Sequence, residues 1–132
     1  MLFSTGNNVI DIDILNTKEL YYGRLGVWQR CQCPVCSNFD ENIQRFDENK
    51  LRFFKELGIS PDKCYDLWAY EPGKSEGTQR YILSYPVVCK CINYTPGEEE
   101  WFCLEEGLSV SIVLDEDGDR LVLDWELKWT HK

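Results

Sequence analysis

Histidine and positive charge are both scarce in this chain. Its 132 residues contain a single His, and 14 Lys and Arg residues stand against 23 Asp and Glu residues, which gives a formal net charge of −9. With one His, catalytic triads that depend on His and metal sites that contain several His residues are not expected. The acidic surface repels phosphate backbones and anionic lipids, so direct binding to nucleic acid or to a membrane surface is not expected either.

Long apolar runs and the common catalytic motifs are also missing. The first eight residues contain neither a basic segment nor an apolar one, and no stretch approaches the length of a membrane span. We therefore expect a cytoplasmic protein whose seven Cys residues are thiols or metal ligands rather than disulfides. The sequence has no G-x-S-x-G motif, phosphate-binding glycine loop or dinucleotide fingerprint, so it does not predict an enzyme.

The sequence does contain enough apolar material for one folded unit. Hydrophobic residues make up 43% of the chain and aromatic residues 14%. A chain of this length can bury one core, but it is short for two. The sequence thus predicts a single domain over residues 1–132.

The N-terminal half predicts strands followed by helices. Ile alternates with Asp between residues 9 and 15, which is typical of a strand with one buried face, and a less regular extended stretch covers 19–29. Ser37 or Asn38 is available as a helix N-cap, Gly58 as the left-handed residue that stops a helix, and the helical part is expected to end by about Cys64. Apolar residues at helical spacing lie between these caps: Phe39, Ile43, Phe46, Leu51, Phe54 and Leu57.

The C-terminal half predicts strands only. Extended segments cover 65–71 and 80–93, and Pro86 suggests an edge or a bulge within the second of these. Apolar residues alternate with polar ones over 108–114 and again over 121–129, on either side of a turn, which predicts a β-hairpin. This order of elements predicts an α+β fold: a mostly antiparallel sheet of about five or six strands, with one or two helices on one face.

The sharpest local motif is the run Cys31-Gln32-Cys33-Pro34-Val35-Cys36. A C-x-x-C pair with Pro in a tight turn is typical of zinc knuckles, because both thiolates have to point at one ion. Side chains two residues apart in a strand face the same side, so Cys89 and Cys91 could complete a four-thiolate zinc site with Cys33 and Cys36. Cys31 could replace one of these ligands.

Other interpretations of the cysteines are open at this point. The three thiolates of the run leave one tetrahedral position open, and Cys64 or Cys103 could supply a single ligand there instead. Free Cys is among the most buried residue types, so these residues could instead belong to the core. A redox role for Cys33 and Cys36 would need a thiol activated at a helix N-terminus, and the predicted order of elements differs from the βαβ order of thioredoxin-like proteins.

An acidic segment that also carries an aromatic residue precedes the closing hairpin. It consists of Glu98, Glu99, Glu100, Trp101, Glu105 and Glu106. Aromatic side chains on an acidic surface make good anchors for a basic partner. We therefore expect the acidic segment to bind a basic protein, with a solvated loop as the alternative.

The cysteine motif and the residues after it resemble a family of small uncharacterised bacterial proteins. The likeness begins with the C-x-C-P-x-C-x-N-F motif at residues 31–39, continues with Phe53-Phe54-x-x-Leu57-Gly58-Ile59, and includes the extended segment 65–70. The family brings no activity with it, and the resemblance implies a metal-binding or structural role for the cysteines. In size and charge the chain is also similar to bacterial immunity proteins and to phage-encoded, anti-CRISPR-like inhibitors of host defence nucleases.

Three functional hypotheses follow. The first is a non-enzymatic acidic binding domain, of the immunity or phage anti-defence type, that inhibits a basic nucleic-acid-binding partner through the acidic segment. The second is a small structural zinc domain in which Cys33, Cys36, Cys89 and Cys91 join helix to sheet. The third is a thiol-dependent enzyme, in which one Cys would react far faster than the others.

Overall fold

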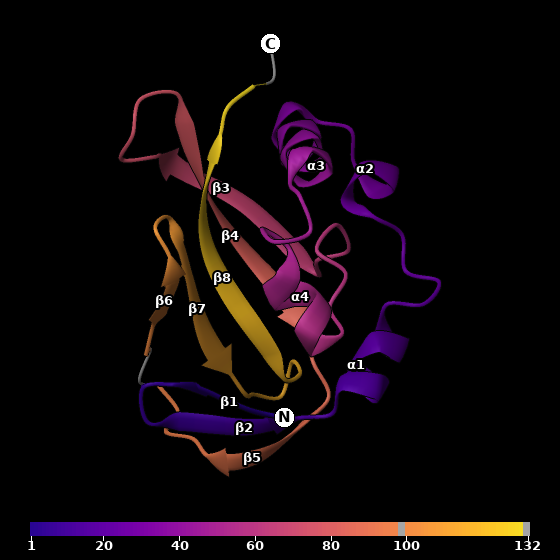
Figure 1. The fold of residues 1–132 in the computed structure, drawn as a ribbon, viewed down its shortest axis with the longest axis vertical. Helices are drawn as coiled ribbons and strands as arrows, with labels where there is room; N and C mark the ends of the chain where they lie inside the picture. Colours follow the sequence, from indigo (N-terminus) through magenta and orange to yellow (C-terminus); the bar gives the residue numbers. More distant parts are fainter. Residues whose placement is uncertain (98–99, 131–132) are drawn as a thin grey trace.

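The computed structural model describes residues 1–97 and 100–130 (Figure 1). Over these residues the helices are α1 (Ile14–Leu20), α2 (Val27–Arg30), α3 (Pro34–Arg45) and α4 (Arg52–Leu57). The strands are β1 (Leu2–Thr5), β2 (Asn8–Ile12), β3 (Asp66–Pro72), β4 (Thr78–Pro86), β5 (Cys89–Asn93), β6 (Phe102–Glu105), β7 (Leu108–Val113) and β8 (Arg120–Lys128). The predicted α+β class is confirmed. None of the helices in this part of the chain combines the length and apolar character needed to cross a membrane.

The larger sheet has five antiparallel strands in the order β3-β4-β8-β7-β6. Its centre is the long pairing of β4 with β8, in which Tyr81 lies opposite Trp125 and Leu83 opposite Leu123. The predicted hairpin is confirmed as β7 and β8, with Val110 opposite Leu123. Because side chains alternate between the two faces of a strand, these pairs put one row of large apolar residues on the same face of the sheet.

The smaller sheet has three antiparallel strands in the order β1-β2-β5. It lies at the opposite end of the molecule from α3 (Figure 1). The predicted single strand over 80–93 is wrong, because β4 ends at Pro86 and β5 starts at Cys89 in the other sheet. The two residues between them are bonded elsewhere: Val87 N–H donates to the Asp119 carbonyl at 3.1 Å, and Val88 N–H donates to Thr17 Oγ1 at 2.9 Å.

Helix α1 corrects two predictions for the N-terminal segment. The strand expected over 9–15 ends at Ile12, because Asp13 caps α1 by accepting the Asn16 backbone N–H on Oδ1 at 3.0 Å. The extended stretch expected over 19–29 is also wrong, since it contains the end of α1, a loop and most of α2. Local polar capping decides this segment over the alternation of Ile and Asp.

Helix α3 begins earlier than predicted. Cys33 is its N-cap and Pro34 its first residue, a position that suits Pro because the first helical N–H groups have no partner within the helix. Ser37 and Asn38, the predicted N-caps, lie inside the helix and are buried. Asn38 Nδ2 donates to Tyr81 Oη and to the Lys128 carbonyl, both at 3.0 Å, and this ties α3 to the larger sheet.

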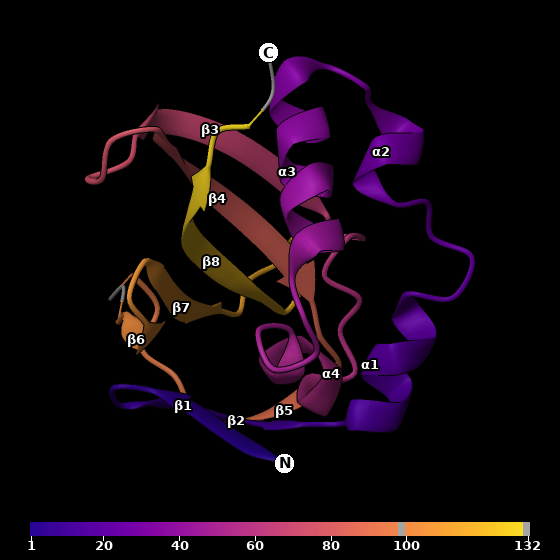
Figure 2. The ribbon, with the colours of Figure 1, turned by 45° about the horizontal axis from the view of Figure 1, so that its top comes forward.

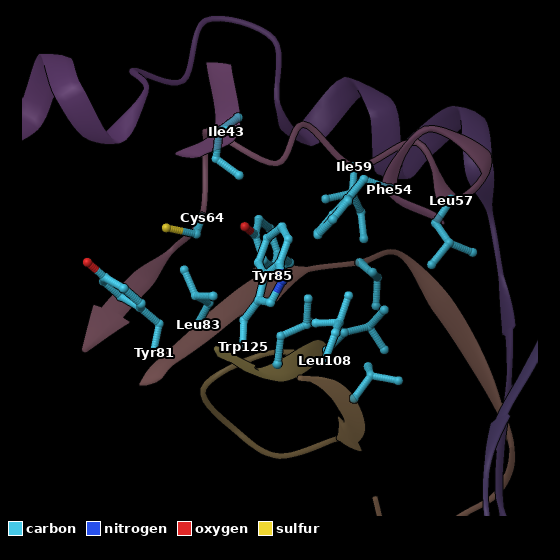
Figure 3. Close-up of a cluster of buried hydrophobic side chains, with 14 of the residues drawn as sticks. Ile43, Phe54, Leu57, Ile59, Cys64, Tyr81, Leu83, Tyr85, Leu108 and Trp125 are labelled. Atoms are coloured by element: carbon cyan, nitrogen blue, oxygen red, sulfur yellow. The ribbon is translucent and has the colours of Figure 1, made fainter. Parts of the chain in front are cut away.

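Helices α3 and α4 cover one face of the larger sheet (Figure 2). Trp125 of β8 is almost fully buried, and it stacks on Phe46 at 5.6 Å and on Phe54 at 5.4 Å between ring centroids. Phe54 also meets Tyr85 edge to face at 5.4 Å. Figure 3 shows Phe54, Tyr85 and Trp125 at the centre of the buried side chains. An aromatic cluster around Trp125 therefore lies between these two helices and the sheet, within a core that is otherwise mainly aliphatic.

Candidate metal centre

Three cysteines lie close together at the junction between α2 and α3. Cys31 directly follows α2 in an extended conformation, and its backbone N–H donates to the Val27 carbonyl at 2.9 Å. Cys33 is the N-cap of α3, and Cys36 lies in the first turn of that helix. Since Pro34 has a fixed φ suited to a helix start, the chain turns sharply here and brings all three side chains to one place.

The three sulfur atoms are close enough to share an ion. The Sγ atoms of Cys31, Cys33 and Cys36 all lie within 4.8 Å of one another. Thiolates bound to one tetrahedral zinc ion lie about 3.8 Å apart, given a zinc–sulfur distance of about 2.3 Å. The three side chains could therefore hold one metal ion. Cys31 and Cys33 are exposed and Cys36 is half-buried, so the cluster opens to solvent.

The start of α3 favours the thiolate form of Cys33. Its Sγ accepts the Cys36 backbone N–H at 3.4 Å, and this bond, followed by one from the Cys31 side chain, lowers the pKa of Cys33 below its ordinary value of 9.0. Burial, followed by hydrogen bonds with Cys33 and Cys31, raises the pKa of Cys36 to about 12. A metal ion would displace the remaining protons, because a bound cation favours deprotonated ligands.

The structure does not bring Cys89 and Cys91 to this cluster. They lie on β5, where they pair with Ile12 and Ile10 of β2 in the smaller sheet. Within residues 1–97 and 100–130, the cysteines that gather closely are Cys31, Cys33 and Cys36. The predicted set of Cys33, Cys36, Cys89 and Cys91 is therefore not assembled. Its physical basis was incomplete, because two cysteines on one side of a strand say nothing about which sheet that strand joins.

The two other candidate ligands are engaged elsewhere. Cys64 is fully buried, and its Sγ lies 4.0 Å from the guanidinium of Arg30. Cys103 is exposed on β6, and its thiol donates to the Glu105 carbonyl at 3.2 Å. Cys31, a substitute ligand in the predicted four-thiolate set, lies in the cluster together with Cys33 and Cys36. The signal was its position two residues before Cys33, at the end of a short helix that the sequence did not predict.

The acidic segment is only partly available for a partner. Glu98 and Glu99 lie outside the described residues. The Glu100 carboxylate accepts the backbone N–H groups of Asn7 and Asn8, and so it holds the turn between β1 and β2. Glu105 pairs with Lys50 at 3.1 Å. Trp101 and Glu106 are exposed, and binding of a basic protein by this segment stays a prediction.

The residues thus assemble one centre with the chemistry to hold a metal ion. Its donors are three thiolates, which are soft ligands that suit zinc and other thiophilic ions. They come from six consecutive residues at the surface, Cys31 to Cys36. In comparisons with protein-family models, with curated proteins and with solved structures, the chain has no match.

Proposed function

We propose that this domain binds one zinc ion through Cys31, Cys33 and Cys36 and leaves the fourth coordination position open to a ligand from another molecule. The observation that supports the proposal is the gathering of three Sγ atoms within 4.8 Å of one another at the surface. Three protein ligands and one open position are typical of zinc sites that exchange ligands, whereas structural sites are closed by four.

The position of the cluster supports an exposed centre over a structural one. A structural zinc ion stabilises a domain by joining segments that are far apart in sequence. Here the three ligands lie within six residues, so an ion bound to them would join only the end of α2 to the first turn of α3. The aromatic core around Trp125 is formed by other residues. Zinc would therefore be presented at the surface for an external thiolate, imidazole or carboxylate.

The test is a metal titration of the reduced protein with a matched set of cysteine variants. Zinc affinity is measured by competition with a chromogenic chelator, and cobalt is used in parallel because its absorption reports thiolate ligands in tetrahedral geometry. We expect one ion per chain. Cys33→Ser and Cys36→Ser should each weaken binding by about tenfold or more, because each removes a ligand.

The controls are two exposed cysteines outside the cluster. Cys91→Ser and Cys103→Ser should leave both stoichiometry and affinity unchanged. If Cys91→Ser weakens zinc binding as much as Cys33→Ser does, the ligands are Cys33, Cys36, Cys89 and Cys91 rather than Cys31, Cys33 and Cys36. Absence of stoichiometric binding to the wild-type protein would overturn the proposal altogether.

A further inference from the structure

We propose that the same centre is controlled by oxidation: Cys33 and Cys36 form a reversible disulfide that releases the zinc ion. This inference rests on the zinc site proposed above and adds its regulation. The oxidant class is a small-molecule disulfide. The observations behind it are the spacing of the two cysteines at the start of α3 and the difference in exposure between their side chains.

The local backbone suits a disulfide between Cys33 and Cys36. Residues three apart in a helical turn have Cα atoms about 5 Å apart, well inside the range of about 4.4–6.8 Å found for disulfides. Cys33 and Cys36 have this spacing, and the Cys36 N–H already reaches Cys33 Sγ at 3.4 Å. Cys31 precedes this turn in an extended conformation, so it does not share the helical spacing of three residues with either of the other two cysteines.

The difference in exposure between the two thiols sets the order of the two exchange steps that form the disulfide. Exposed Cys33 attacks one sulfur of the incoming disulfide, a mixed disulfide forms, and one small thiolate leaves. Half-buried Cys36 then attacks Cys33 Sγ, closes the protein disulfide and expels the second thiolate. In sum, two protein thiolates lose two electrons, and the small disulfide gains them as it becomes two thiolates.

Closure of this disulfide removes two of the three zinc ligands. A disulfide sulfur carries no charge and binds zinc poorly, whereas zinc sites are built from thiolates. Cys31 alone would then remain, and one exposed thiolate does not hold the ion against water. The zinc ion leaves with its oxidation state unchanged, since zinc has no redox chemistry of its own. Reduction restores all three thiolates and the site.

The test uses the full chain loaded with zinc under reducing conditions and then transferred to oxidised glutathione. Zinc release is followed with a chromogenic chelator, and disulfides are mapped by alkylation, digestion and mass spectrometry. We expect one zinc ion released per Cys33–Cys36 disulfide, and rebinding after reduction. Low protein concentration suppresses disulfides between copies through the exposed Cys91 and Cys103.

Variants identify the pair. Cys31→Ser should still form the disulfide between Cys33 and Cys36, whereas Cys36→Ser should stop at a glutathione adduct on Cys33. Cys33→Ser is expected to fold, because this exposed position is a helix N-cap and Ser is a favoured N-cap residue. In Cys33→Ser, any disulfide between Cys31 and Cys36 should form more slowly than the Cys33–Cys36 disulfide forms in the wild-type protein.

Each outcome separates the two proposals. If the reduced protein binds no zinc, the proposed function and the switch both fail. If zinc binds but stays bound while Cys33 and Cys36 are oxidised, the switch alone fails. The switch also fails if the mapped disulfide joins another pair, or if oxidised glutathione at large excess leaves both thiols reduced.

Discussion

Cys33 and Cys36 are three residues apart, yet their surroundings move the pKa values of the two thiols in opposite directions. The Cys36 backbone N–H stabilises the negative charge on Cys33 and lowers its pKa. Cys36 is half-buried, and its burial raises its pKa to about 12 because the charged form loses solvation. A group with a lowered pKa reaches its ionised form at lower pH, so Cys33 ionises first as the pH rises.

This difference predicts selective alkylation. In metal-free, reduced protein, iodoacetamide should modify Cys33 long before Cys36, because the thiolate is the nucleophile. The rate at Cys33 should fall with decreasing pH through a midpoint below 9.0, its ordinary value. Pulsed alkylation at a series of pH values, read by peptide mass spectrometry, measures both rates. In denaturant the two thiols should react alike, and equal rates in the folded protein would contradict the assignment.

Helices α1 and α4 meet at a glycine. Gly58 ends α4 in the left-handed conformation, with a φ of +79°. A Cβ atom at this position would lie 2.5 Å from the Ile14 carbonyl oxygen and 3.2 Å from the Lys18 backbone nitrogen. Gly58 therefore meets two requirements, a positive φ and a close approach of α1 to the end of α4.

A matched pair of variants separates these two requirements. Gly23 has a φ of +73°, and a Cβ atom there would have no atom within 4 Å. Gly23→Ala should lower the free energy of unfolding by about 1–2 kcal/mol, the cost of the left-handed conformation. Gly58→Ala should lower it by about 1–3 kcal/mol more, because of the overlap with α1. Urea denaturation followed by tryptophan fluorescence measures both, and equal losses would show that α1 moves aside freely.

At the scale of single helices and strands, the sequence predicts those features that depend on neighbouring residues. The cap at Gly58 and the hairpin of β7 and β8 depend on neighbouring residues, so local patterns predict them. Ile14 continues the alternation of Ile10 and Ile12 but begins α1, because the Asp13 side chain bonds the next turn. The local polar cap therefore overrides the alternation of apolar residues at this position.

The cysteines show the same difference between local spacing and contacts with distant residues. Cys31, Cys33 and Cys36 lie in one short run, so their spacing alone indicates a shared ion. Cys91 lies opposite Ile10, 81 positions earlier in the chain, and no local pattern indicates that pairing. Local spacing therefore indicates the candidate cluster, whereas the position of Cys89 and Cys91 depends on which strands pair.

The whole molecule is organised around a core that the candidate metal centre touches only at its edge, where Cys36 packs against the buried residues. Phe46, Phe54 and Trp125 stack between helices and sheet, while the cysteines open to solvent at the start of α3. A ligand stabilises a fold only to the extent that it binds the folded chain better than the unfolded one. Three thiolates within six residues can also converge on one ion in an unfolded chain. The affinity for zinc should therefore differ little between the folded and the unfolded chain.

Zinc should therefore add little to global stability. Cys33→Ser is expected to change the free energy of unfolding by less than about 1 kcal/mol, since the position is exposed and Ser is a good N-cap. Chelation should likewise leave cooperative unfolding in place. Leu123→Ala in the core is the positive control, with an expected loss of about 2–5 kcal/mol. A comparable loss on chelation, measured by thermal or urea denaturation, would make the zinc ion a structural one.

Only Val87 and Val88 separate β4 from β5, although these strands belong to different sheets. Both residues are hydrogen-bonded to distant parts of the chain, Val87 to Asp119 and Val88 to Thr17. Exchange of the smaller sheet between two copies of the protein would require a hinge that can straighten. Straightening this crossing would break both of these hydrogen bonds, so the contacts that hold the two sheets together also oppose domain swapping at this point.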